Sequence, residues 1–173
     1  EQAERQAQAE AARVPYEPGV YLVEGGEIRP IPRAEAKAVS STGRSILKRL
    51  VPYPIVAGKI TVEIDGERSA NVVTNPRQEF YFRLDLPEKF AIFRLEVKKK
   101  SRLVQTWEIL PLSDEVVEQE EAIPILHRQL DENLYRVWPT EPLKPGEYAV
   151  VEYTNGQRNI QIWDFSLRPA SKP

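Results

Sequence analysis

Apolar residues recur at every second position through much of this 173-residue chain, and this period of two limits the possible folds more than any other feature. The alternation is clearest in the segments 60–64, 80–86, 93–97 and 103–109. Glycine, proline, asparagine or aspartate separates the short segments, as expected for turns between strands. About ten strands at this spacing predict an all-β fold, specifically a single antiparallel β-sandwich.

Turn residues and helix breakers predict how the strands are connected. Gly25-Gly26 predicts an extra N-terminal hairpin over residues 19–31, and the basic tip 98–102 predicts another hairpin between residues 93 and 109. Residues 40–52, which end at Pro52, predict a short helical connector. The acidic segment 112–122 is expected to be mostly loop. The predicted organisation is a helical or disordered tail over 1–14, the sandwich domain over 15–168 and a disordered tail over 169–173.

One motif near the C-terminus predicts the type of sandwich. Leu143, Pro145, Gly146 and Tyr148 stand in the order LxPGxY. This arrangement resembles the tyrosine corner of immunoglobulin-like and fibronectin-like β-sandwiches of the kind found in secreted bacterial proteins. The resemblance covers residues 133–167 and implies that the Tyr148 hydroxyl binds backbone a few residues upstream. The paired cysteines of antibody domains are absent, because the chain has no cysteine.

The last two predicted strands carry apolar residues on both faces. Tyr148 and Val150 fall on one face, and Ala149, Val151 and Tyr153 fall on the other. Such a strand is covered on both sides, and the cover is expected to be the N-terminal hairpin, the connector or a partner. In the last strand the apolar phase changes, which predicts a β-bulge at residues 162–164. A bulge there either corrects the twist or turns Trp163 toward a surface.

The sequence contains few of the residues that catalytic or metal-binding sites require. The only histidine, His127, is the one available base for a serine triad, and no G-x-S-x-G stretch surrounds a serine. The simpler interpretation of His127 is a loop or strand-end residue. We therefore expect no catalytic, cofactor or metal residue, although a hydrolase that uses two of the 26 acidic residues stays an alternative.

Aromatic and charged residues suggest two binding hypotheses. Trp107, Trp138 and Trp163 could form a platform for sugar rings, but tryptophan in an alternating strand is usually a core residue. Charge is segregated: residues 29–59 hold seven basic residues and one acid, and residues 108–132 hold eight acids and one base. These segments are either two solvated loops or complementary patches between chains.

The function that these observations favour is a non-catalytic protein-binding or assembly subunit, with a carbohydrate-binding module as the alternative. The candidate interaction surface consists of Arg44, Lys48, Arg49, Ala149, Val151, Tyr153 and Trp163. A net charge of −2 gives no reason to expect nucleic acid as a partner. No apolar run is long enough for a membrane helix. The chain has no methionine, which fits a removed signal peptide and an extracytoplasmic location.

Overall fold

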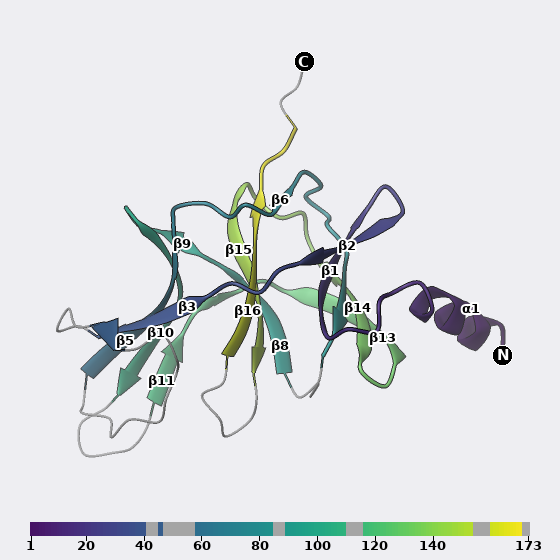
Figure 1. Ribbon diagram of the computed structural model, residues 1–173, viewed down its shortest axis with the longest axis horizontal. Helices are drawn as coiled ribbons and strands as arrows, with labels where there is room; N and C mark the ends of the chain where they lie inside the picture. Colours follow the sequence, from purple (N-terminus) through teal and green to yellow (C-terminus); the bar gives the residue numbers. More distant parts are fainter. Residues whose placement is uncertain (41–44, 47–57, 85–88, 110–115, 154–159, 171–173) are drawn as a thin grey trace.

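The computed structural model describes residues 1–40, 45–46, 58–84, 89–109, 116–153 and 160–170 (Figure 1). In this part of the chain one helix is followed by strands that pair almost entirely in antiparallel fashion. The elements are α1 (Gln2–Ala11), β1 (Gly19–Glu24), β2 (Glu27–Ile31), β3 (Ala36–Ser40), β4 (Ser45–Ile46), β5 (Gly58–Asp65), β6 (Val72–Val73), β7 (Phe80–Arg83), β8 (Lys89–Arg94), β9 (Glu96–Val97), β10 (Ser101–Ile109), β11 (Val116–Gln119), β12 (Glu121–Ala122), β13 (Ile125–Asp131), β14 (Leu134–Pro139), β15 (Gly146–Tyr153) and β16 (Ile160–Leu167).

The strands form three sheets. Sheet A has the order β13-β14-β7-β1-β2, sheet B the order β11-β10-β5-β3-β4 with β9 beside β10, and sheet C the order β12-β8-β15-β16-β6. Sheet C lies between the other two, with sheet A toward α1 and sheet B on the far side (Figure 1). The all-β, sandwich-like fold predicted from the alternation is therefore confirmed, and a third sheet is added to it.

Two hydrophobic cores explain why sheet C is apolar on both faces. Tyr148 and Val150 of β15 pack toward sheet A, in a core that includes Phe80, Phe82 and Val137. The residues between them on β15 point the other way and pack against sheet B, because side chains on a strand alternate between faces. That second core contains Val62, Ile64, Phe93, Val104, Trp107, Ala149, Val151 and Ile162.

The cover on the outer side of β15 is therefore sheet B. It is neither the N-terminal hairpin, which belongs to sheet A, nor a partner. Ala149 and Val151 are completely buried, so the expectation that they form an interaction surface is wrong. Strands β3 to β5 and β9 to β11 supply this cover.

Strand β16 contains no bulge. Its pairing with β15 runs without interruption from Gly146 opposite Leu167 to Tyr153 opposite Ile160. The change of apolar phase arises because Ile162 belongs to the core with sheet B, and Phe165 to the core with sheet A. A strand that is buried on both faces produces the same sequence pattern as a bulge, which is why the prediction failed.

Three further local predictions are corrected by the pairing. Ser45–Ile46, inside the predicted helical connector, pairs with β3 as a strand. Ser40, the first residue of that connector, is the last residue of β3, and the remaining connector residues lie outside the described residues. The acidic segment contains β11 and β12 where a loop was expected. The hairpin at the basic tip joins only β9 to β10, because β8 pairs with β15 in sheet C. The chain changes sheets between β8 and β9.

The LxPGxY segment forms a tightly bonded corner between β14 and β15. The buried Tyr148 hydroxyl donates a hydrogen bond to the Lys144 carbonyl oxygen at 2.6 Å, and the Tyr148 ring stacks on Phe165. Leu143 is buried, and the Arg94 guanidinium donates to the Pro145 carbonyl oxygen. Burial raises the pKa of the Tyr148 phenol, in spite of the nearby Arg94 cation. The ring thus satisfies a backbone group at the turn and fills the adjoining core.

The same spacing occurs at the start of β1. Pro18, Gly19 and Tyr21 match Pro145, Gly146 and Tyr148, and the Tyr21 hydroxyl donates to the carbonyl oxygen of Glu17, also four residues upstream, at 2.5 Å. The two tyrosines lie on different sheets. A proline-glycine pair followed two residues later by tyrosine therefore fixes the entry into a strand at both places.

Candidate functional site

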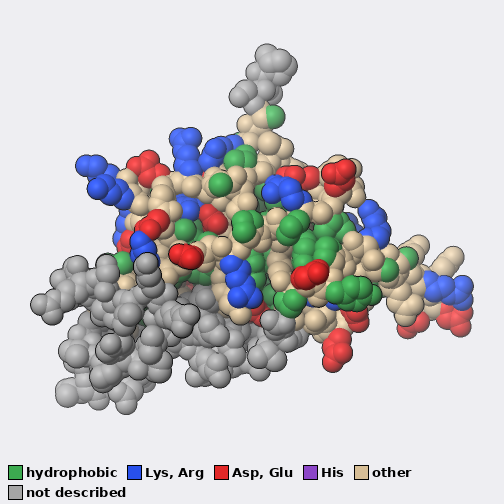
Figure 2. Space-filling view, viewed as in Figure 1, with side chains coloured by type: hydrophobic (Ala, Val, Ile, Leu, Met, Phe, Trp, Pro, Cys, Tyr) green, Lys and Arg blue, Asp and Glu red, His purple; other side chains and the backbone are tan. Residues whose placement is uncertain are grey.

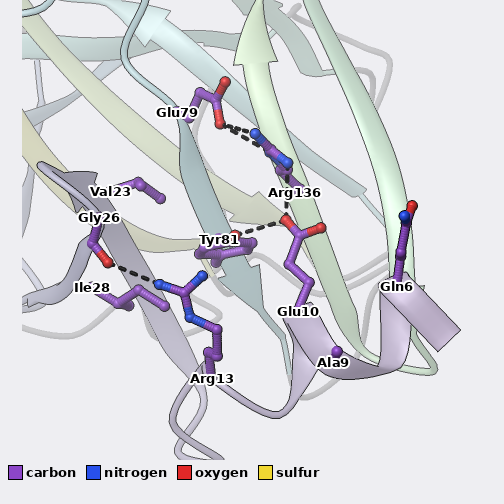
Figure 3. A pocket seen from close by; sticks show the side chains of 10 residues that line it. All are labelled: Gln6, Ala9, Glu10, Arg13, Val23, Gly26, Ile28, Glu79, Tyr81 and Arg136. Carbon is purple, nitrogen blue, oxygen red and sulfur yellow. Dashed lines mark hydrogen bonds and ion pairs between the residues drawn. The ribbon is translucent and has the colours of Figure 1, made fainter.

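A groove runs between α1 and the outer face of sheet A (Figure 3). Its volume is about 450 Å³. Helix α1 forms one wall, and β1, β2, β7 and β14 form the floor. The lining residues are Gln6, Ala9, Glu10, Arg13, Val23, Gly26, Ile28, Glu79, Tyr81 and Arg136.

A charged network fixes α1 to the sheet at the edge of this groove. Glu10 accepts hydrogen bonds from the Tyr81 hydroxyl at 2.7 Å and from the Arg136 guanidinium at 3.0 Å. Arg136 also pairs with Glu79 through two nitrogens on one carboxylate oxygen (Figure 3). Burial, and then the hydrogen bond to Glu10, raise the pKa of Tyr81 to about 12. The network holds a helix that buries none of its own residues.

Arg13 lies at the other end of the groove. Its guanidinium donates to the Gly26 carbonyl oxygen in the β1–β2 turn at 2.9 Å (Figure 3). Within the described part of the chain it forms no ion pair, whereas Arg136 has two carboxylate partners. The groove thus combines an apolar floor at Val23 and Ile28 with one uncompensated cation. This composition, an apolar floor with a few positioned polar groups, is typical of ligand-binding surfaces.

Strand β13, at the edge of sheet A, carries most of its side chains in solvent. Leu126 is 51% exposed, which makes it one of the few large apolar side chains on the described surface. His127 is exposed, and its ring contacts Phe90 and Tyr135 at centroid distances of 5.4 and 5.8 Å. In the space-filling view, hydrophobic side chains gather over the strands of sheet A beside α1, with charged side chains around them (Figure 2).

A second charged cluster lies inside the molecule, between sheets B and C. Arg102 of β10 pairs with Asp164 at 2.6 Å and with Glu147 at 3.4 Å, and all three residues are buried. Glu147 also accepts hydrogen bonds from the Ser69 backbone N–H and the Ser166 hydroxyl. Because these groups bind one another and are closed off from solvent, we assign the cluster to stability and not to ligand binding.

The structure does not bring the predicted interaction residues together on one surface. Arg44, Lys48 and Arg49 lie outside the described residues, and Tyr153 is placed only as part of β15. Trp163 is buried in the core with sheet A and is not turned toward a surface; the Arg33 guanidinium lies 5.7 Å from its ring.

The three tryptophans do not share an exposed platform. Trp107 is buried in the core with sheet B and Trp163 in the core with sheet A, while Trp138 on β14 is half-buried. The acidic and basic segments meet only at their ends among the described residues, where Glu108 stands opposite Lys59 in the β10–β5 pair. Strands β11 and β3–β4 lie at opposite edges of sheet B.

Sequence reasoning missed the groove and the edge strand. The groove depends on Glu10 meeting Arg136, which are 126 positions apart, and no local pattern indicates such a pair. The exposed β13 edge had a partial signal in the sequence, because Leu126 is followed by three polar residues, His127, Arg128 and Gln129, without regular alternation.

Neither a metal-binding cluster of described residues nor a known relative assigns a function to the chain. Among the residues with described positions, no group of three or more His, Cys, Asp or Glu side chains is placed to hold a metal ion. Within the same residues, no helix combines the length and apolar character needed to cross a bilayer. The chain matches no family model, no curated protein and no solved structure.

Proposed function

We propose that the chain is a non-catalytic protein-binding module in which sheets A and C form an immunoglobulin-like sandwich and the outer side of sheet A receives a protein partner. The observation that carries the proposal is the exposed end of sheet A. An open groove and a half-exposed leucine occur together on the outer side of this sheet. Two arginines there have no ion-pair partner among the described residues: Arg128 of β13, and Arg13, which follows α1 and lines the groove.

Strand order supports the immunoglobulin-like part of the proposal. In that fold one sheet has strands in the order A-B-E-D and the other in the order C-F-G. Taking β1, β7, β14 and β13 as A, B, E and D reproduces the order of sheet A, and taking β8, β15 and β16 as C, F and G reproduces that of sheet C. Tyr148 then stands near the start of strand F, where the tyrosine corner belongs.

The remaining strands give the module its individual form. On this assignment β3–β5 and β9–β11 are additions that cover the C-F-G sheet with sheet B. A face that is covered by the same chain is closed to partners, so binding is left to the other sheet and to the edges. The extracytoplasmic location expected from the sequence stays a prediction.

Site-specific photo-crosslinking in the cells that make the protein tests this function. A benzoylphenylalanine replaces Leu126 in one variant and Val97 in another, and the adducts are identified by mass spectrometry. The two positions are matched, because each side chain is 51% exposed and apolar, but Val97 lies on β9 in sheet B. We expect a protein adduct from position 126 that is weak or absent from position 97.

Three outcomes are informative. A foreign protein, or a second copy of this chain, crosslinked at position 126 supports the binding function. Adducts at position 97 alone support a protein-binding function but place the binding surface on sheet B instead of sheet A. The absence of protein adducts at both positions, together with a monomer in sedimentation at low and high salt, refutes the proposal.

A further inference from the structure

The edges of the three sheets differ in how they are protected against pairing with another strand. Strands β4, β6 and β12 consist of two residues each, and β2 contains Pro30. Short strands and prolines are ordinary protections of a sheet edge. Strand β13 has seven residues, more than any other edge strand that the structure describes, and it contains neither proline nor lysine. A register shift between Gln129 and Asp131 and the packing of α1 beside this strand protect it in part, but the side chains of Leu126, His127, Arg128 and Gln129 are exposed.

The hydrogen-bond phase of β13 shows which backbone groups face outward. The Thr140 N–H donates to the Pro124 carbonyl oxygen at 3.0 Å, in the same register as the β13–β14 ladder. Hydrogen-bonded and non-hydrogen-bonded pairs alternate along an antiparallel ladder. The backbone groups of Leu126 and Arg128 therefore point to β14, and those of Ile125 and His127 point to the open edge.

The side chains beside this edge define what could pair with it. Leu126 stands opposite the half-buried Trp138, and Arg128 stands opposite Arg136. Arg136 is neutralised by Glu79 and Glu10, but Arg128 is exposed and forms no ion pair with a described residue. On the outer face the edge thus presents one apolar side chain and, two residues later, one free cation.

We propose that the open edge of β13 binds an extended antiparallel segment of a partner protein in which a carboxylate residue precedes an apolar residue by two positions. In an antiparallel pair, such a carboxylate stands opposite Arg128 and the apolar residue opposite Leu126. Both are then in non-hydrogen-bonded pairs, where side chains approach closest. Backbone hydrogen bonds at His127 supply affinity, as in other cases of strand addition. The inference rests on the proposed function and gives it a recognition rule.

Charge complementarity favours a foreign segment over a second copy of β13 as the occupant. With the backbone of Ile125 and His127 facing outward, self-pairing places only even-numbered residues opposite Arg128. Before the register shift at residues 129–131 these are Pro124, Leu126 or a second Arg128, and none is acidic; Asp131 and Glu132 lie beyond the shift. A foreign segment can provide the missing carboxylate.

The test is fluorescence-anisotropy titration of the full chain with a labelled, end-capped peptide of sequence TTEVITT. The control peptide TTKVITT differs only in having lysine in place of the glutamate, which reverses the charge. The decisive protein variant is His127→Pro, which removes an outward N–H and no hydrogen bond inside the sheet. His127→Thr is the control, because it changes the same side chain and keeps the N–H.

We expect TTEVITT to bind the unaltered protein and His127→Thr equally, and His127→Pro roughly five- to tenfold more weakly, as follows from one lost backbone hydrogen bond. TTKVITT should bind roughly three- to tenfold more weakly than TTEVITT, and Arg128→Glu should reverse that preference. Circular dichroism must show that His127→Pro is folded. A second measurement does not need the proline variant: we expect hydrogen exchange at the Ile125 and His127 amides of the unaltered protein to become slower when the peptide is added.

Several results overturn the inference. Absence of saturable binding at millimolar peptide, equal affinity for the proline and threonine variants, or no preference between the two peptides each rejects strand addition at β13. Self-association that His127→Pro abolishes assigns the edge to a second copy instead. If a partner crosslinks near Leu126 but its binding is unchanged by His127→Pro, the binding function stands and the strand-addition inference falls.

Discussion

Replacing Arg102 by alanine should destabilise the protein more than any other single loss of charge in the described residues. The Arg102 side chain is 3% exposed and donates to Asp164, to Glu147 and to the backbone carbonyl oxygens of Gly66 and Asp65. These contacts connect β10 of sheet B with β15 and β16 of sheet C and with the turn after β5. One side chain therefore joins two sheets.

The magnitude follows from what the substitution leaves behind. Glu147 keeps hydrogen bonds from the Ser69 N–H and the Ser166 hydroxyl, but the side-chain carboxylate of Asp164 loses its described partner. Removing one member of a buried ion pair costs about 3–5 kcal/mol, because a charge stays buried without compensation. A value of about 4 kcal/mol is a large share of the roughly 5–15 kcal/mol that stabilises a typical domain.

Urea unfolding followed by tryptophan fluorescence measures this cost. With a dependence of about 2 kcal/mol per molar urea, the midpoint of Arg102→Ala should fall by about 2 M. The control is Lys37→Ala, which removes a largely exposed ion pair with Asp65 and should cost less than about 1 kcal/mol. Adding Asp164→Asn to Arg102→Ala should recover part of the loss. If Arg102→Ala and Lys37→Ala cost the same, the reasoning about the buried cluster is wrong.

Three further changes test the corner, the groove and the second core. Tyr148→Phe removes the hydroxyl that binds the Lys144 carbonyl oxygen and should lower the free energy of unfolding by about 1–3 kcal/mol, measured with urea. The pKa of Tyr81 is raised from 10.0 to about 12, so its stabilising contribution is complete below pH 10 and is lost as the pH rises to 12. Tyr81→Phe should therefore show a shallower loss of stability over that range, and an unchanged slope would contradict the assignment. Val151→Asp places a charge in the core between sheets B and C and should unfold the chain, seen by circular dichroism; a folded variant that only loses partner binding would refute its place in the core.

Local patterns in the sequence were sufficient for several of the longer strands and for one corner. Alternation identified β5, β7 and β10, and the segment 93–97 covers the end of β8 and β9, since a period of two is a property of each strand by itself. The LxPGxY motif located Tyr148, whose hydroxyl reaches a carbonyl four residues upstream. Strands of two residues, such as β6 and β12, are too short to produce a period and were missed.

Long-range pairing could not be obtained in this way. Strand β7 lies between β1 and β14, so the neighbours of a central strand are about 60 residues away on one side and about 50 on the other. The docking of α1 likewise depends on Glu10 meeting Arg136 and Tyr81. The N-terminal segment has almost no apolar stripe, so its sequence predicted a tail and not a wall of the groove.

A strand that is apolar on both faces can be covered by its own chain or by another molecule, and the local sequence is the same in both cases. The two solutions differ in where binding surfaces are left. Here sheet B, built from β3–β5 and β9–β11, buries Ala149 and Val151 completely. The faces of sheet C are therefore not accessible to a partner. The groups that remain available for binding lie at the edge of sheet A: the outward backbone of β13, the guanidinium of Arg128 and the half-exposed Leu126. Partner recognition is therefore expected to depend on backbone pairing at an edge, where single side-chain substitutions weaken binding modestly and loss of one N–H weakens it more.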